Sequence, residues 1–172
     1  DLLAENTLIN TSTGYVVGNF AGGSYTYNHC TIANYPVAFF SGDAAFVVTD
    51  NLDLEDGSNL YNPINISLSN TIVWGNLEEE IILNLSQPDQ SNIQTRNSIL
   101  KTSLDILEGD RTFLSTETDF LPFKDIDNYD YTPDTLSPAI DNALGSEMEY
   151  DLFGLQRDSL PDIGAIEYLL NN

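Results

Sequence analysis

One short unit recurs along the chain, and it constrains the fold more than any other feature of the sequence. Each copy opens with asparagine and continues through β-branched or apolar residues, and the copies begin at Asn6, Asn28, Asn70 and Asn97. Their starts are 22, 42 and 27 residues apart. A spacing in the twenties is typical of one coil of a parallel β-solenoid, and the long spacing indicates a coil with an insertion. We place that insertion at residues 50–62, which are rich in Asn, Asp, Glu and Gly.

The rest of the sequence has the pattern of many short strands joined by turns. Gly, Asn, Asp or Pro separates nearly all of the β-branched and aromatic runs. The runs that we expect to form strands are Thr7–Ile9, Tyr15–Phe20, Tyr25–Ile32, Val37–Phe40, Ala45–Thr49, Ile64–Val73, Glu80–Leu85 and Asn92–Leu100. This pattern predicts an all-β fold. Four imperfect repeats also leave open an antiparallel sandwich whose turns are rich in asparagine.

A single coil of a solenoid is too thin to have a core of its own. Its inward Ile, Leu, Val and Phe side chains must pack against the next coil, with adjacent strands about 4.8 Å apart. Asparagine suits a corner of such a stack, because its amide can bond along the stack and its backbone tolerates a left-handed turn. We assign residues 1–101 to the coils, and residues 102–172 to the final coil and a polar capping tail of the same domain.

The charge of the chain excludes several classes of partner. The sequence has 27 acidic and 5 basic residues, which gives a net charge of −22. Such a field repels nucleic acid, anionic lipid headgroups and polyanionic sugars. No stretch has the length and apolarity of a transmembrane helix, and we recognise no signal peptide at the first residues. We therefore expect no nucleic-acid partner and no direct membrane insertion of this segment.

Cys30 is the only cysteine, so the chain has no internal disulfide. Thr31 and Ile32 follow it, which favours an inward position in a strand, where a free thiol packs as a small hydrophobic group. A catalytic thiol needs a basic partner, and His29 is adjacent in sequence. Consecutive side chains of a strand point to opposite faces, so we interpret Cys30 as structural.

The sequence selects no catalytic residue. Lyases that act on uronic acids need a base and a group that neutralises the sugar carboxylate, but the basic residues are dispersed at positions 96, 101, 111, 124 and 157. Glycoside hydrolases need two carboxylates at a set separation. Acidic residues are so abundant that none of the possible pairs stands out, and a hydrolytic pair remains an alternative.

The most highly charged cluster of the tail surrounds a single arginine. Its members are Asp141, Asp151, Arg157, Asp162 and Glu167. The planar guanidinium of Arg157 can bind one or two carboxylates bidentately. We predict an ion-pair clasp that ties the tail to the last coil. The alternative is a catalytic or ligand-binding site.

Two further candidate sites have open alternatives. Asp125, Asp127 and Asp130 lie in a polar stretch and could bind calcium, or they could form a solvated acidic loop. The segment Asn51–Gly57 is similar to an EF-hand loop, but its glycine falls one place late, so that motif fails. Trp74 could stack on a glycan at the surface, or it could pack in the interior as aromatic side chains of stacked coils commonly do.

Several motifs occur in a recognisable order along the chain. They are Asn28–Asn34, Asn70–Asn76, Phe120–Asp125, Ser137–Asp141, Asp151–Arg157 and Asp162–Glu167. In these motifs the chain resembles the C-terminal portion of secreted right-handed parallel β-helix proteins of Bacteroidota-type bacteria, the choice-of-anchor Q domain proteins. Ser137–Asp141 and the stretch from Asp151 to Glu167 are the most specific matches. One departure is Phe-Leu-Pro-Phe at residues 120–123, where the family favours Asp-Pro-Leu-Phe.

The resemblance implies a right-handed parallel β-helix of about four to five coils with a C-terminal capping tail. It also implies an extracellular or outer-membrane location and a longer parent chain, since family members usually carry more coils. It implies no single reaction. We expect a non-catalytic scaffold or binding module that contacts a glycan or another envelope protein. The alternatives are a fragment of a polysaccharide lyase or glycoside hydrolase with its active site mainly upstream, and an accessory subunit of an outer-membrane complex.

Two tripeptides match the Asp-Ser/Thr-aliphatic acceptor pattern of O-glycosylation in Bacteroidota. They are Asp134–Leu136 and Asp158–Leu160, so the acceptors would be Thr135 and Ser159. A pattern of three residues recurs by chance, and we treat both positions as hypotheses.

Overall fold

The computed structural model describes residues 1–35, 42–104, 112–116, 121–145 and 148–169. Among these residues the regular elements are β-strands, apart from two short 3₁₀ helices, η1 (Pro88–Gln90) and η2 (Ile126–Asn128). The prediction of an all-β protein is therefore confirmed. Within the same residues, no helix has the length and apolarity needed to cross a bilayer. The predicted strand Val37–Phe40 lies outside the described residues.

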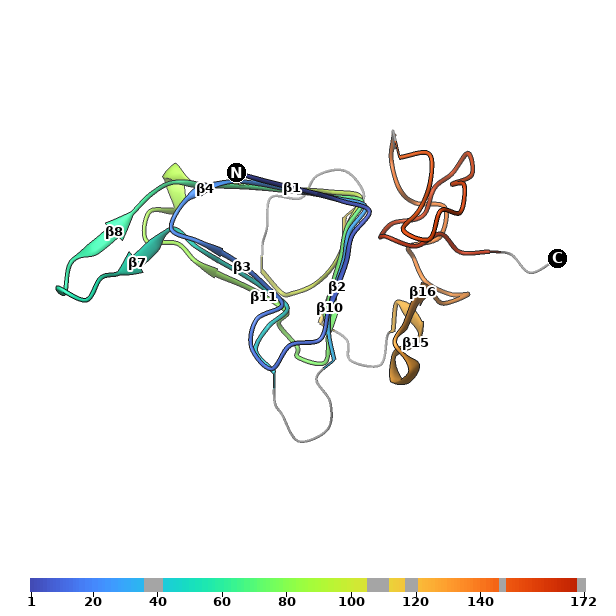
Figure 1. The fold of residues 1–172 in the computed structure, drawn as a ribbon, viewed down its shortest axis with the longest axis horizontal. Helices are drawn as coiled ribbons and strands as arrows, with labels where there is room; N and C mark the ends of the chain where they lie inside the picture. The colour runs from blue at the N-terminus through green and yellow to red at the C-terminus, as the bar shows by residue number, and fades with distance from the viewer. Residues whose placement is uncertain (36–41, 105–111, 117–120, 146–147, 170–172) are drawn as a thin grey trace.

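Within the described part of the chain, three parallel sheets lie around a common interior like the sides of a triangle (Figure 1). Sheet A contains β1 (Leu2–Glu5), β4 (Gly23–Asn28), β9 (Ile64–Ser69) and β12 (Asn92–Arg96). Sheet B contains β2 (Leu8–Asn10), β5 (Thr31–Asn34), β10 (Ile72–Gly75), β13 (Ile99–Lys101) and β14 (Phe113–Ser115). Sheet C contains β3 (Val17–Phe20), β6 (Phe46–Thr49) and β11 (Ile81–Asn84). The chain enters the sheets in the order A, B, C on three successive passes, so the antiparallel sandwich alternative is wrong.

In the described residues, antiparallel strands pair in two hairpins, and an isolated antiparallel bridge joins Tyr150 to Gln156. The first hairpin, β7 (Asn51–Asp53) with β8 (Asn59–Tyr61), projects from the corner between sheets C and A (Figure 1). It occupies the segment in which we placed the insertion. The second, β15 (Phe123–Asp125) with β16 (Asp130–Pro133), belongs to the tail.

A corner ladder of left-handed residues joins sheet A to sheet B on successive passes. Its members are Asn6, His29, Asn70 and Asn97, with φ values of 46°, 49°, 48° and 43°. Asparagine tolerates this region because its short polar side chain can hydrogen-bond locally. Asn28 pairs with Ser69 and precedes the corner, so histidine occupies the ladder on the second pass. Our alignment of the second sequence unit was therefore one residue out.

The corner ladder also explains why three predicted strands were too long. Tyr25–Ile32 is divided into β4 and β5, and Ile64–Val73 and Asn92–Leu100 are divided in the same way at Asn70 and Asn97. A left-handed residue turns the backbone without interrupting the apolar pattern on either side of it. Hydrophobic pattern alone could not place these turns.

The side chains that point between the three sheets form an apolar core. In sheet B, Ile9, Ile32, Val73 and Leu100 follow one another across the strands, so like residues stack on like residues. Buried residues of sheet A and sheet C join them, among them Ile66 and Phe46. Stacking of this kind buries each pass against the next, as the repeat spacing predicted.

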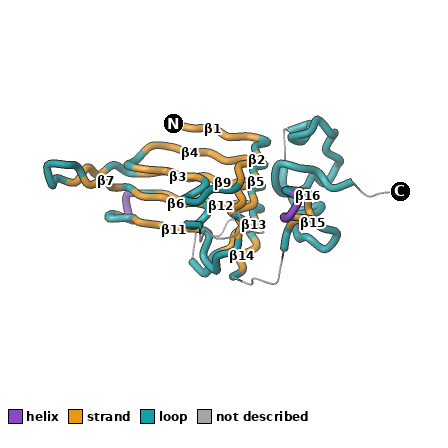
Figure 2. Tube along the Cα trace, turned by 60° about the horizontal axis from the view of Figure 1, so that its bottom comes forward, coloured by secondary structure: helices purple, strands orange, loops and turns teal. Residues whose placement is uncertain are grey.

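The tail covers the side of the stack (Figure 2). Ile72, Trp74 and Ile99 on the outer face of sheet B form a second buried cluster with tail residues. The tail members of this cluster are Phe123, Tyr131, Ala139, Ile163, Ala165 and Ile166. We predicted a polar cap over the end of the last coil, whereas the tail packs sideways against several strands of sheet B. That position explains why β5, β10 and β13 are buried along their whole length.

Gly164 is the point of closest approach between the tail and sheet B. Its φ of 103° lies in a region that other residues rarely adopt. A Cβ atom there would lie 2.9 Å from Oγ1 of Thr31 and 3.0 Å from Cδ1 of Ile72. The backbone N–H of Gly164 donates to the oxygen of Asn70, and that of Ala165 donates to Oγ1 of Thr31. The Asp-Ile-Gly-Ala motif is therefore a docking segment.

Replacing Asn70 with alanine tests the corner ladder. Asn70 Nδ2 donates to the oxygen of Leu144, and Oδ1 accepts from its backbone N–H over 2.9 Å. The variant should lose roughly 3 kcal/mol of unfolding free energy, because alanine disfavours the left-handed turn and leaves both tail groups without a partner. Urea unfolding measures the loss, with Asn65→Ala on exposed sheet A as the matched control. Equal small losses in the two variants would contradict the role of the ladder.

Candidate functional site

Arg157 is the centre of the charged cluster in the tail. Its side chain is buried, which is rare for arginine unless partners surround it. Nη1 lies 2.8 Å from Oε2 of Glu167 in an ion pair, and Nη2 donates to Oδ1 of Asn6 over 3.0 Å. The guanidinium also donates to the backbone oxygens of Gly164 and Asp162. Arg157 thereby joins the tail to Asn6 on the first pass of the chain, and not to the last coil as we predict from the sequence.

The aspartates of the predicted cluster lie close by but make different contacts. Asp162 accepts hydrogen bonds from the backbone N–H groups of Asp141 and Tyr168. Asp141 contributes through its backbone, while the residue itself is exposed. Asp151 accepts hydrogen bonds from backbone N–H groups. Among the described residues, Glu167 is the acid that forms an ion pair with Arg157.

Two titratable groups at this junction have pKa values that burial shifts against their charged forms. Burial raises the pKa of Asp162 to about 6, and the nearby Glu167 carboxylate acts in the same direction. Burial, followed by the positive charge of Arg157, lowers the pKa of His29 to about 4. His29 Nδ1 lies 3.3 Å from the oxygen of Gly164, and Nε2 lies 3.1 Å from Nδ2 of Asn70. A neutral ring that donates from Nδ1 and accepts at Nε2 satisfies both contacts.

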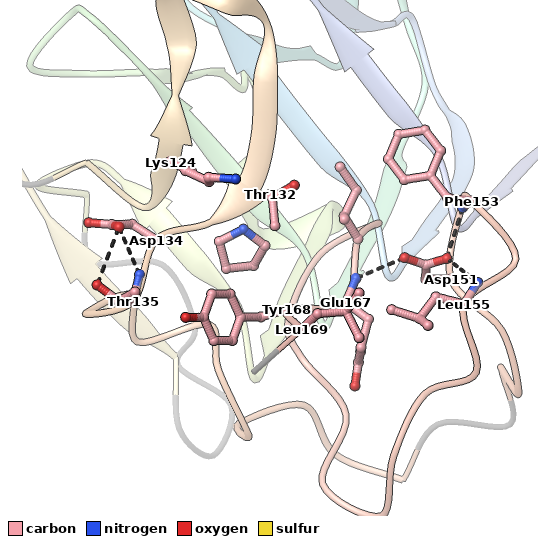
Figure 3. A pocket seen from close by; sticks show the side chains of 12 residues that line it. Lys124, Thr132, Asp134, Thr135, Asp151, Phe153, Leu155, Glu167, Tyr168 and Leu169 are labelled. Atoms are coloured by element: carbon pink, nitrogen blue, oxygen red, sulfur yellow. Dashed lines mark hydrogen bonds between the residues drawn. The ribbon is translucent and has the colours of Figure 1, made fainter. Parts of the chain in front are cut away.

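A pocket of about 450 Å³ lies in the tail, between hairpin β15–β16, the turn after Asp151 and residues 166–169 (Figure 3). Its apolar lining consists of Pro133, Phe153, Leu155, Ile166, Tyr168 and Leu169. Lys124, Asp134 and Thr135 lie at the end of the pocket opposite Phe153 (Figure 3). The volume and the mixture of apolar walls with a few polar groups are typical of small-ligand sites.

The carboxylates of the pocket are engaged in structural hydrogen bonds. Asp151 Oδ1 accepts from the backbone N–H groups of Phe153 and Leu155, each over 2.8 Å, and its Oδ2 accepts from that of Glu167 over 3.0 Å. Glu167 is paired with Arg157, and Asp134 accepts from the backbone N–H of Thr135 over 2.8 Å. These acids hold the walls of the pocket in place. The arrangement can bind a ligand, but it offers no acid and base poised on a reacting bond.

The prediction that Trp74 stacks on a glycan is wrong. Trp74 is 0% exposed and lies beneath the tail on the outer face of sheet B. Lys101 Nζ lies 5.5 Å from the centre of its ring, in a cation–π contact. The alternative of interior packing is correct, because the tail converts the outer face of sheet B into a second core.

Sequence reasoning gave no signal for a buried pair of charged residues beside Trp74. Both oxygens of Glu80 accept backbone hydrogen bonds, from Leu77 and Ala45, each over 2.7 Å. Burial raises the pKa of Glu80, while these hydrogen bonds and the positive charge of Lys101 oppose the rise. Lys101 Nζ donates to the oxygen of Gly75 over 2.6 Å. The pair therefore stabilises the turn between sheets B and C.

The aspartates at which we predicted calcium are engaged elsewhere. Asp125 Oδ1 accepts from the backbone N–H of Asn128 at the start of η2, and Asp130 Oδ2 lies 3.4 Å from Lys124 Nζ. Asp127 is exposed. In the part of the chain that the structure describes, no three His, Cys, Asp or Glu side chains are arranged to hold a metal ion. The alternative of a solvated acidic loop fits this geometry better.

Cys30 and the two proposed glycosylation acceptors lie in opposite environments. Cys30 is buried, its Sγ donates to the oxygen of Ala4, and burial raises the pKa of its thiol, so it is no activated nucleophile. Thr135 and Ser159 are exposed, and Thr135 also lines the pocket. Their modification stays a prediction.

No protein-family model, curated protein or solved structure matches this chain. The family resemblance therefore remains a prediction. The sequence pattern does not predict the pocket, although Leu155 and Tyr168 lie in or next to its recognisable motifs. Phe153 was the one residue that could have indicated the pocket, because a large aromatic residue before the glycine of a turn is often exposed. It is 74% exposed.

Replacing Arg157 with methionine should destabilise the fold by roughly 3–5 kcal/mol, because Glu167 would stay buried without its partner. The control is Lys124→Met, which removes an exposed ion pair worth at most about 1 kcal/mol. Chemical unfolding of both variants measures the difference. A loss in the arginine variant no larger than that of the control would show that Arg157 is dispensable.

The low pKa of His29 predicts that the free energy of unfolding depends on pH. The unfolded chain protonates histidine near its ordinary pKa of 6.5, whereas folded His29 stays neutral down to about pH 4. Stability therefore falls as pH drops through this interval. His29→Asn removes this titration. The free energy of unfolding of the variant, relative to that of the wild type, should therefore rise by roughly 2 kcal/mol as the pH falls from about 7 to about 4.5. Urea unfolding at both pH values measures the gain, and a difference that is constant with pH contradicts the prediction.

Proposed function

We propose that this chain is a right-handed parallel β-helix. Three observations support the solenoid. The chain enters sheets A, B and C in the same order on successive passes, like residues stack in the core, and left-handed residues recur at one corner. The right-handed sense comes from the family resemblance, and it agrees with the hand of nearly all parallel crossover connections.

We propose further that the protein is a non-catalytic scaffold and binding module, secreted or on the bacterial cell surface, that contacts a glycan or another envelope protein. The secreted or cell-surface location is inferred from the family resemblance. A net charge of −22 suits a soluble surface protein that must avoid anionic polymers. The buried docking of the tail on sheet B gives the module rigid surfaces.

The observation that carries the proposal is the state of the tail pocket. It has the volume of a ligand site and presents the exposed ring of Phe153. Its acids Asp151 and Glu167 are occupied by backbone and arginine donors. A glycoside hydrolase would need two carboxylates free to exchange protons with the substrate or attack it. Binding without chemistry is the use that this pocket supports best.

One observation favours the alternative of a hydrolase. Asp162 has a pKa of about 6, which suits a general acid, and it lines a smaller cavity of about 150 Å³. However, Asp162 is 3% exposed, and its two oxygens accept hydrogen bonds from Asp141 and Tyr168. Its raised pKa follows from its burial in the docking segment, so we assign it a structural role.

Phe153→Ala tests the binding function. Purified protein is sedimented with envelope fragments of a Bacteroidota bacterium and, separately, incubated with a panel of neutral and acidic polysaccharides. We expect retention on the envelope, at least about tenfold weaker retention of the variant, and no release of reducing or unsaturated sugars. Leu160→Ala, an exposed tail residue outside the pocket lining, is the matched control. Turnover of a polysaccharide, or equal retention of both variants, would contradict the proposal.

A further inference from the structure

The outer face of sheet A differs from the rest of this acidic surface. Alternate residues of its strands point into the core, and the remaining ones point outward. The outward residues of β4, β9 and β12 are Ser24, Thr26, Asn28, Asn65, Ser67, Ser69, Asn92, Gln94 and Arg96. None of these nine side chains of the described strands is acidic, aromatic or aliphatic, although 27 of the 172 residues are acidic.

Strand register arranges these side chains in rows. Ser24 pairs with Asn65 and Asn65 with Asn92, and a second row runs from the exposed Leu3 of β1 through Thr26 and Ser67 to Gln94. Adjacent strands lie about 4.8 Å apart, so these rows repeat a hydroxyl or amide at that interval on β4, β9 and β12. The third row runs from Glu5 of β1 through Asn28 and Ser69 to Arg96. Charge on this row is therefore confined to its two ends.

The face is hollowed rather than flat. A depression of about 370 Å³ and another of about 100 Å³ lie on it, and both are lined by Thr26. The larger one is bounded by Leu144 and Gly145 of the tail, and Glu5 and Arg96 line it together with polar residues. The wall is fixed in place because the backbone of Leu144 exchanges hydrogen bonds with the side chain of Asn70. The result is a groove with a polar floor along the outer face of sheet A.

The chemistry of the floor selects one class of ligand. Hydroxyl and amide side chains both donate and accept hydrogen bonds, as the hydroxyl groups of a sugar do. A protein partner would find few of the aromatic and apolar anchors that form the centre of protein interfaces. A polyanion, including nucleic acid or an acidic polysaccharide, would be repelled by the net charge of −22. Regular rows of uncharged groups suit an extended polymer of neutral sugar units.

We propose that the groove on the outer face of sheet A binds an uncharged, extended oligosaccharide. This inference rests on the proposed binding function, and it names the ligand class and a surface separate from the tail pocket. Thr26, Ser67 and Gln94 form the central row of the site. Leu144 and Gly145 form its side wall.

The test is isothermal titration of the protein with neutral hexasaccharides of glucose, xylose and mannose, and with oligogalacturonate as the anionic probe. We expect at least one neutral hexasaccharide to bind and oligogalacturonate not to bind. Ser67→Glu, which places bulk and charge in the central row, should weaken that binding at least about tenfold. The matched control, Ser159→Glu, makes the same change at an exposed tail position and should stay within about twofold.

The outcomes separate this inference from the proposed function. Thermal unfolding first verifies that Ser67→Glu is folded, and Gln94→Glu on the same row provides a second variant. If Phe153→Ala abolishes binding while Ser67→Glu and Gln94→Glu retain it, the groove is not the binding site, although the proposed binding function stands. Failure of all three neutral hexasaccharides, or preference for oligogalacturonate, would overturn the ligand class. Retention on envelope fragments would then still decide the proposed function.

Discussion

The left-handed turn between sheets A and B is the constraint on which the rest of this structure depends. It directs each pass of the chain from one sheet to the next, and it turns the side chains of Asn6, Asn70 and Asn97 outward toward the tail. Those amides bind backbone groups of the tail at Tyr150, Leu144 and Asn142. One local conformation therefore serves two purposes, because it bends the chain and provides the donors that fasten the tail. Without the tail, the outer face of sheet B, with Ile72, Trp74 and Ile99, would be an exposed apolar surface.

Burial under the tail also accounts for the unusual electrostatics of the docking segment. A chain with 27 acidic residues places several of them inside, where a charge without partners is costly. Glu167 is balanced by Arg157, and Asp151 and Asp162 by hydrogen bonds from backbone N–H groups. His29 stays neutral for the same reason, since Arg157 and burial both oppose a second positive charge. The shifted pKa values and buried charges of these groups are similar to those of an active site, but they arise from the packing of the tail on sheet B.

The tail contributes to both surfaces to which we assign binding. The tail pocket forms where the segment around Phe153 meets hairpin β15–β16, and the groove on sheet A gains its wall from Leu144 and Gly145. The two sites differ in chemistry, since the pocket is apolar with an aromatic wall and the groove has a floor of hydroxyl and amide groups. A rigid module with two such surfaces can hold one partner while it contacts another, which suits a scaffold in a cell envelope.

The all-β character, the repeat spacing, the asparagine corner and the importance of Arg157 follow from the sequence alone, because each is a local pattern or a scarce residue type. The sequence also identified the Asp-Ile-Gly-Ala segment, whose Gly164 is required by a positive φ and close packing. Three features required the three-dimensional arrangement: His29 occupies the corner on the second pass, the tail covers the side of the stack, and Trp74 is buried. The exposure of a side chain depends on what packs against it from far along the chain. A strand that is apolar on both faces shows that a cover exists, but it does not show which segment provides it.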